Sequence, residues 1–127
     1  MPPFPKTPGK YFGTEINEKW WKRYRKQKML ARGSGTFWCD DQSIQFHRKL
    51  TREPITIPFR NIIGFKVGKW QAGQWAGGAE VLKVLWKKES QNLSSGFVVS
   101  GSSKAVEELI RELEALIPSG RPLRKLT

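Results

Sequence analysis

The sequence contains very little cysteine and histidine: Cys39 and His47 are the only residues of their types. A single thiol excludes an internal disulfide and a zinc site built from several cysteines. The chain also lacks any run approaching the roughly 18 consecutive apolar residues of a membrane-spanning helix, and its first residues do not form the apolar core of a signal peptide. We therefore expect a soluble, cytoplasmic protein, with peripheral attachment to a membrane as the alternative.

Positive charge is the strongest feature that is present. The 127 residues include 23 Lys and Arg against 11 Asp and Glu, which gives a net charge of +12 and a pI near 10.2. Residues 1–36 hold nine cations and two carboxylates (+7), whereas the other 91 residues hold 14 cations and nine carboxylates (+5). Such an excess favours polyanionic partners, namely nucleic acid, an anionic bilayer or an acidic protein.

The N-terminal part of the chain predicts an extension in two pieces. Residues 1–13 include four prolines and two glycines, a composition typical of a flexible arm. Over residues 14–32, Ile16, Trp20 and Tyr24 recur at every fourth position, so they share one face of a helix. Because lysines and arginines surround them, the pattern predicts a basic aromatic helix.

The rest of the chain predicts short strands followed by one helix. Apolar residues alternate with polar ones, or form short runs, in residues 35–39, 43–49, 54–59, 62–70, 80–88 and 95–100. Pro54 and Pro58 would place the third of these strands at a sheet edge. Apolar residues from Val106 to Ile117 lie on one helical face, which predicts an amphipathic helix over residues 103–117. A basic tail, residues 119–127, follows.

Two segments resemble known signatures. Residues 35–46 (Gly-Thr-Phe-Trp-Cys-Asp-Asp-Gln-Ser-Ile-Gln-Phe) resemble the opening hairpin of bacterial pleckstrin-homology-like (PH-like) and GRAM domains. Residues 57–65 (Ile-Pro-Phe-Arg-Asn-Ile-Ile-Gly-Phe) resemble the next signature of that family. The resemblance extends over about residues 30–117. It implies a mainly β domain over residues 33–118, in which two nearly orthogonal antiparallel sheets form a partly open barrel plugged by the C-terminal helix.

The same resemblance bears on the ligand. Phosphoinositide-binding members of the superfamily place Lys and Arg around the turn of the first hairpin. Here residues 39–43 occupy that turn, and the carboxylates of Asp40 and Asp41 would repel a phosphorylated headgroup. We therefore expect no inositol-phosphate pocket at this turn.

No set of residues predicts catalysis. The lone Cys39 and His47 are expected to be a buried apolar residue and a solvent-facing strand residue, respectively. Residues 64–70 (Gly-Phe-Lys-Val-Gly-Lys-Trp) have one residue too few between the glycines for a phosphate-binding loop, and no Ser or Thr follows the lysine. We predict no catalytic, cofactor-binding or metal-binding residue, no cofactor and no small-molecule substrate.

Two segments predict binding to a partner. The first is the basic aromatic segment, whose aromatic residues either dock on the barrel or form a binding arm. The second is the glycine-rich loop of residues 68–79, whose tryptophans either fold back on the core or contact a partner. The candidate binding residues are Lys19, Trp20, Trp21, Lys22, Arg23, Arg25, Lys26, Lys69, Trp70 and Trp75.

These features predict a non-enzymatic PH-like binding or scaffold module. Its partner would be an anionic lipid surface or a protein, and self-association into a homo-oligomer is a further possibility. The alternative is a nucleic-acid-binding protein, because Trp20, Trp21 and Tyr24 alternate with cations and could stack on bases.

Overall fold

The computed structural model describes residues 4–23, 33–49, 54–71, 73–99, 103–117 and 124–125. Its elements are β1 (Phe4–Ile16), β2 (Lys19–Arg23), β3 (Gly33–Cys39), β4 (Ser43–Arg48), β5 (Ile55–Pro58), the 3₁₀ turn η2 (Phe59–Asn61), β6 (Ile62–Gly68), β7 (Trp70–Gln71), β8 (Gln74–Trp75), β9 (Val81–Lys88), β10 (Gln91–Val98), α1 (Ser103–Leu116) and β11 (Arg124–Lys125). The prediction of a mainly β fold with a C-terminal helix is confirmed. Among the described residues, no helix combines the length and apolar character needed to cross a membrane.

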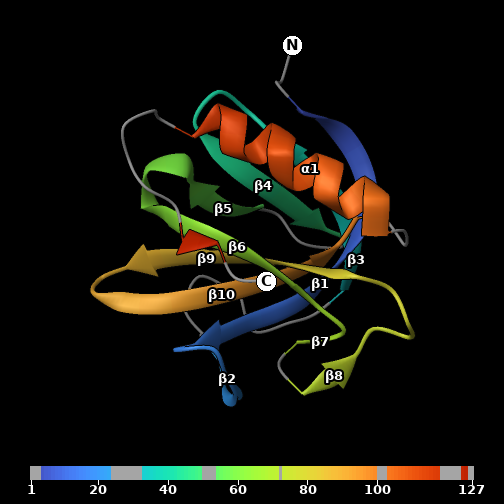
Figure 1. Ribbon diagram of the computed structural model, residues 1–127, viewed down its shortest axis with the longest axis vertical. Coiled ribbons are helices and arrows are strands. Elements are labelled where there is room, and N and C mark those ends of the chain that lie inside the picture. The colour runs from blue at the N-terminus through green and yellow to red at the C-terminus, as the bar shows by residue number, and fades with distance from the viewer. Residues whose placement is uncertain are drawn as a thin grey trace.

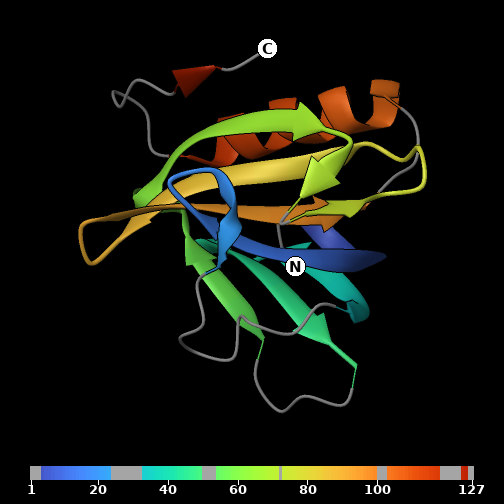
Figure 2. The same ribbon diagram turned by 90° about the horizontal axis from the view of Figure 1, so that it is seen from below.

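One large sheet forms the body of the molecule. Its nine strands follow the order β11-β6-β9-β10-β1-β3-β4-β5, with β2 paired to β1 outside this path. The strands pair antiparallel, except that β11 runs parallel to β6. Figures 1 and 2 show that the sheet bends at β1, so that β6, β9 and β10 form one layer and β3, β4 and β5 the other. The sheet is open, because β5 and β11 end the path without pairing to each other.

The prediction of a flexible arm over residues 1–13 is wrong for residues 4–13, which belong to β1. The prolines are tolerated because of where they lie. Pro8 pairs with Thr36 of β3, but β1 pairs with β10 only from Lys10 onward, so the proline-containing half of β1 has a neighbour on one side. Pro5 lies where the β1–β3 register shifts. Edges and bulges are the places where a sheet accepts proline.

The predicted helix over residues 14–32 is also wrong for residues 14–23. They form the end of β1, a tight reversal and β2. Asn17 (φ 54°) and Glu18 (φ 56°) both adopt left-handed backbone conformations, as the central residues of a type I′ hairpin turn do. The remaining residues of that prediction, 24–32, lie outside the described part of the chain.

The core lies between the two layers and under α1. The predicted apolar face of the helix is confirmed, since Leu109, Leu113 and Ile117 are buried against strand residues. The ring of Phe97 lies 5.5 Å, between centroids, from that of Phe37 and also from that of Phe46. A sheet that carries this much apolar surface on one side directs its polar residues to the opposite, outer side.

A chain of buried hydrogen bonds crosses the same core. The Tyr11 hydroxyl lies 2.6 Å from Oγ1 of Thr14, which lies 2.7 Å from Oγ of Ser95. The indole of Trp86 donates to the same serine oxygen at 3.0 Å. All four side chains are buried, and their bonds to one another satisfy polar atoms that would otherwise be costly to remove from water.

Candidate functional site

Two tryptophans form an exposed pair on a small hairpin. β7 and β8 pair antiparallel with Trp70 opposite Trp75, and Gly73 (φ 81°) supplies the left-handed residue at the reversal. The two rings lie 6.5 Å apart between centroids. Trp70 is 59% exposed and Trp75 55%, so neither folds back on the core. Exposed tryptophans are unusual because this residue is highly buried on average, and here two of them lie side by side.

Gln71 attaches this hairpin to the main sheet. Its side chain is completely buried, and its Nε2 donates to the carbonyl oxygens of Gly13 (3.2 Å) and Ser94 (2.7 Å). A Cβ at position 96 would overlap the side chain of Gln71, so the glycine there leaves the space that Gln71 fills. The hairpin is therefore fixed on the outer face of β1 and β10, and its exposed tryptophans are held in place.

Lys69, a predicted binding residue, is engaged within the loop. Its Nζ donates to the carbonyl oxygen of Gly78 at 3.0 Å and lies 3.4 Å from a carboxylate oxygen of Glu80. Gly77 and Gly78 have positive φ angles of 67° and 94°, which glycine adopts without strain. Part of the Lys69 charge is thus neutralised by a neighbour on the same loop.

A cavity of about 430 Å³ lies between this hairpin and the β1–β2 turn. Trp70 and Gln71 line it from the hairpin, and Glu15, Glu18 and Lys83 from the sheet and the turn. Burial lowers the pKa of Lys83, and the nearby Glu15 and Glu18 act in the opposite direction. Glu18 also lies 3.4 Å from Nζ of Lys66. The walls therefore carry charges of both signs close together.

The remaining candidates lie in the connection from β1 to β3. Lys19, Trp20, Trp21, Lys22 and Arg23 form β2, whose side chains are not described, and Arg25 and Lys26 lie outside the described residues. Figures 1 and 2 place β2 and the β7–β8 hairpin at the same end of the molecule. The structure thus places the backbone of β2 at the same end of the molecule as the tryptophan pair.

This topology corrects one expectation. β1 precedes β3 in the chain and pairs directly with it, so β3 and β4 are not the first strands of the domain. The connection from β1 to β3, residues 17–32, holds seven cations and one carboxylate. The acidic turn of residues 39–43 belongs to the β3–β4 hairpin. The expectation that residues 35–46 form the opening hairpin is therefore wrong, and the carboxylates of Asp40 and Asp41 lie away from the connection of β1 to β3.

The acidic turn itself is a structural unit. Oδ1 of Asp40 accepts hydrogen bonds from the backbone N–H of Gln42 (2.8 Å), and from the N–H (2.7 Å) and the hydroxyl (2.9 Å) of Ser43. Burial raises the pKa of Asp40, but these bonds and one from Gln45 outweigh it and hold the pKa below 3.8. A carboxylate engaged in this way stabilises a turn.

Cys39 and His47 do not form a catalytic pair. Cys39 pairs with Ile44, whereas His47 pairs with Thr36, three positions along the ladder, so the two side chains face opposite sides of the hairpin. Burial, followed by the nearby Asp40 and Glu112, raises the pKa of the Cys39 thiol to about 12. Such a thiol carries almost no thiolate at neutral pH and is not a nucleophile. Among the described residues, no group of His, Cys, Asp or Glu could hold a metal ion.

The sequence did not reveal Gln71, Glu15 or Lys83 as site residues. Gln71 stands in a Gly- and Ala-rich stretch, and its bonding partner Gly13 is 58 positions away. Alternation along β9 is the one signal that could have identified Lys83. It would turn Lys83 away from the core side, which Leu82 and Val84 occupy.

The chain was compared with known proteins. A family model described as bacterial PH domain-like matches residues 2–114, which span β1 through most of α1. No curated protein matches the chain. The match includes the N-terminal strand, in agreement with the central position of β1 in the sheet.

Proposed function

The chain belongs to the bacterial PH domain-like family, and we propose that it is a non-enzymatic module that binds an anionic membrane surface. The observation that carries this proposal is the exposed pair of Trp70 and Trp75, on a hairpin fixed to the sheet by Gln71. Tryptophan is enriched where proteins meet the bilayer interface, because its ring is apolar and its N–H is polar.

The charge of the chain supports an anionic surface over a neutral one. The connection of residues 17–32 has a net charge of +6, from seven cations and one carboxylate, and starts at the end of the molecule where the tryptophans lie. Each cation held near a negative leaflet contributes about 1 kcal/mol of binding free energy. The membrane-binding residues would be Lys19, Trp20, Trp21, Lys22, Arg23, Arg25 and Lys26 together with the tryptophan pair.

Sedimentation with vesicles tests the proposal. We expect the protein to bind vesicles of equimolar phosphatidylcholine and phosphatidylglycerol more tightly than vesicles of phosphatidylcholine alone. The double variant W70A/W75A should bind at least tenfold more weakly, which corresponds to about 1.4 kcal/mol. The control variant Trp38→Ala removes a half-buried tryptophan of β3, and its vesicle affinity should stay within about twofold of the wild type.

Each other outcome has a meaning. Equal failure to bind both vesicles would refute the membrane proposal. If the protein instead binds single-stranded DNA in a salt-dependent manner, the nucleic-acid alternative replaces it. If W70A/W75A and Trp38→Ala bind vesicles equally well, the tryptophan pair is not the membrane contact.

A further inference from the structure

A groove of about 460 Å³ shares none of its described lining residues with the cavity that Lys83 lines. Residues of β1, β3 and β10 form its floor, and Ala76 and Ala79, just after the hairpin, form a wall. A smaller hollow of about 270 Å³ shares Lys10, Phe12 and Ser34 with it and reaches Gln74 of β8. The two form one depression along the hairpin.

Two lysines lie in a row at this groove. Lys10 of β1 pairs with Ser34 of β3, and the N–H of Lys49, just after β4, donates to the carbonyl oxygen of Ser34 at 3.0 Å. Two strand spacings separate the lysines, or about 10 Å between backbones, and residues in one row of a sheet point to the same face. The hydroxyl of the exposed Ser34 lies between them.

The charge of this groove has one sign. Among the residues that the structure describes, its lining includes Lys10 and Lys49 and no carboxylate, in contrast to the Lys83 cavity, which carries Glu15 and Glu18. Both lysines are exposed. An anion between the two ammonium groups would be attracted to both of them.

The other part of the groove is apolar. Phe12 lies where the β1–β10 register shifts, and its largely buried side chain lines the groove together with Lys10. Val98 of β10, paired with Lys10, adds to this surface, and the small side chains of Ala76 and Ala79 leave room above it. The groove thus combines a cationic end with an apolar trough.

We propose that this groove binds one anionic lipid molecule, with the phosphate between Lys10 and Lys49 and an acyl chain along Phe12 and Val98. The hydroxyl of Ser34 donates a hydrogen bond to the phosphate. This inference deepens the proposed membrane function, because it assigns a discrete lipid site to a surface that otherwise binds through general charge and exposed tryptophans.

Isothermal titration calorimetry with monomeric lysophosphatidylglycerol, below its micelle-forming concentration, tests this site. We expect saturable binding, and at least tenfold weaker binding of lysophosphatidylcholine, whose headgroup has no net charge. The variant K10Q/K49Q should lose at least tenfold in affinity for lysophosphatidylglycerol. The control K87Q/K104Q removes the same charge from exposed lysines of β9 and α1 and should change the affinity by less than about threefold.

A second variant tests the apolar trough without changing charge. Ala79→Leu should fill it and weaken lysophosphatidylglycerol binding at least tenfold, while its thermal unfolding stays close to that of the wild type. Equal affinity for the two lysolipids, or equal losses in K10Q/K49Q and K87Q/K104Q, would overturn the assignment. So would an Ala79→Leu variant that binds lysophosphatidylglycerol like the wild type.

The two proposals fail in different ways. If vesicles bind but monomeric lysophosphatidylglycerol does not, the membrane function stands and the lipid site is wrong. If the lysolipid binds in the groove but anionic vesicles do not, the lipid site stands and the membrane function is wrong.

Discussion

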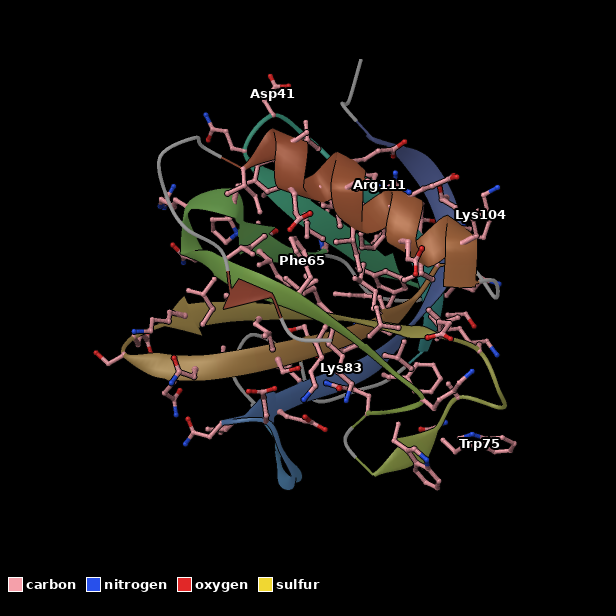
Figure 3. The ribbon with its side chains drawn as sticks, viewed as in Figure 1. Asp41, Phe65, Trp75, Lys83, Lys104 and Arg111 are labelled. Carbon is pink, nitrogen blue, oxygen red and sulfur yellow. The ribbon has the colours of Figure 1, made fainter. Side chains whose placement is uncertain are left out.

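Two short chain reversals at opposite ends of the molecule use their side chains in opposite ways. Figure 3 shows Asp41 of the β3–β4 turn at one end and Trp75 of the β7–β8 hairpin near the other. In the turn, Oδ1 of Asp40 accepts three hydrogen bonds from the turn itself. In the hairpin, the buried Gln71 makes the polar contacts, and the large apolar side chains face solvent.

The comparison distinguishes a charge that stabilises its own turn, at Asp40, from a surface that is available for binding, at Trp70 and Trp75. A carboxylate whose hydrogen bonds are made within its own turn has little capacity left for a partner. When a partner removes two exposed indoles from water, the binding free energy becomes more favourable, because apolar burial is favourable. Charge alone would have suggested the acidic turn as a site, whereas hydrogen bonding and exposure favour the hairpin.

Thiol labelling gives the largest expected difference between the two regions. Cys39 lies at the end of β3, next to the turn, with no exposed surface and a pKa of about 12. We compare it with Trp75→Cys in a Cys39→Ala background. At pH 8, iodoacetamide should modify the hairpin cysteine at least about 10³-fold faster, because thiolate is the reactive form and an ordinary thiol has a pKa near 9.0. Similar rates would show that the turn region opens readily.

Removing the side chain that attaches the hairpin should have the next largest effect. Gln71→Ala leaves the carbonyl oxygens of Gly13 and Ser94 without their side-chain donor, so we expect a loss of about 2–3 kcal/mol in the free energy of unfolding. Urea denaturation measures it. The control Gln74→Ala, at the exposed position opposite Gln71, should cost less than about 0.5 kcal/mol. Equal losses would mean that Gln71 does not hold the hairpin.

A smaller effect is expected at the turn. Asp40→Ala should lower the free energy of unfolding by about 1 kcal/mol and leave vesicle binding unchanged. Since the pKa of Asp40 is held below 3.8 in the folded state, its contribution is present at higher pH and is lost as the pH falls through that lowered pKa. Urea denaturation of wild type and variant at pH 7 and pH 3 should show the difference shrinking at the lower pH. A constant difference would contradict the role of the charged form.

The same contrast explains which parts of the fold the sequence could predict. Strands with clear alternation, such as β4 and β6, and the apolar face of α1 follow from side-chain periodicity, and the structure confirms them. β1 did not follow, because prolines suggested a flexible arm although they lie on its half-paired part and at a register shift. In β10, the buried residues Ser94 and Ser95 are polar, so the sequence shows no apolar pattern over the first half of the strand.

The candidate site was predictable only in part. Trp70 and Trp75 were identified by residue type, but their exposure depends on the pairing of β7 with β8 and on Gln71. The spacing of Ile16, Trp20 and Tyr24 matches one face of a helix, and it matches no other local structure. The left-handed turn at Asn17 leads into β2, and this turn depends on the pairing of β2 with β1. Strand pairing of this kind leaves no periodic signal in a single sequence.

The smallest expected effect concerns Lys69, a cation that lies beside the tryptophans and is engaged by its own loop. If it contacted a negative leaflet freely, its removal would cost about 1 kcal/mol, or about fivefold in affinity. Because Nζ lies 3.4 Å from Glu80 and donates to Gly78, we expect Lys69→Gln to weaken binding to anionic vesicles by less than about twofold. Glu80→Gln, which removes the counter-charge, should strengthen binding by a similar small factor. A fivefold loss in Lys69→Gln would instead place this lysine in the binding surface, and the contrast with Asp40 would then rest on the tryptophans alone.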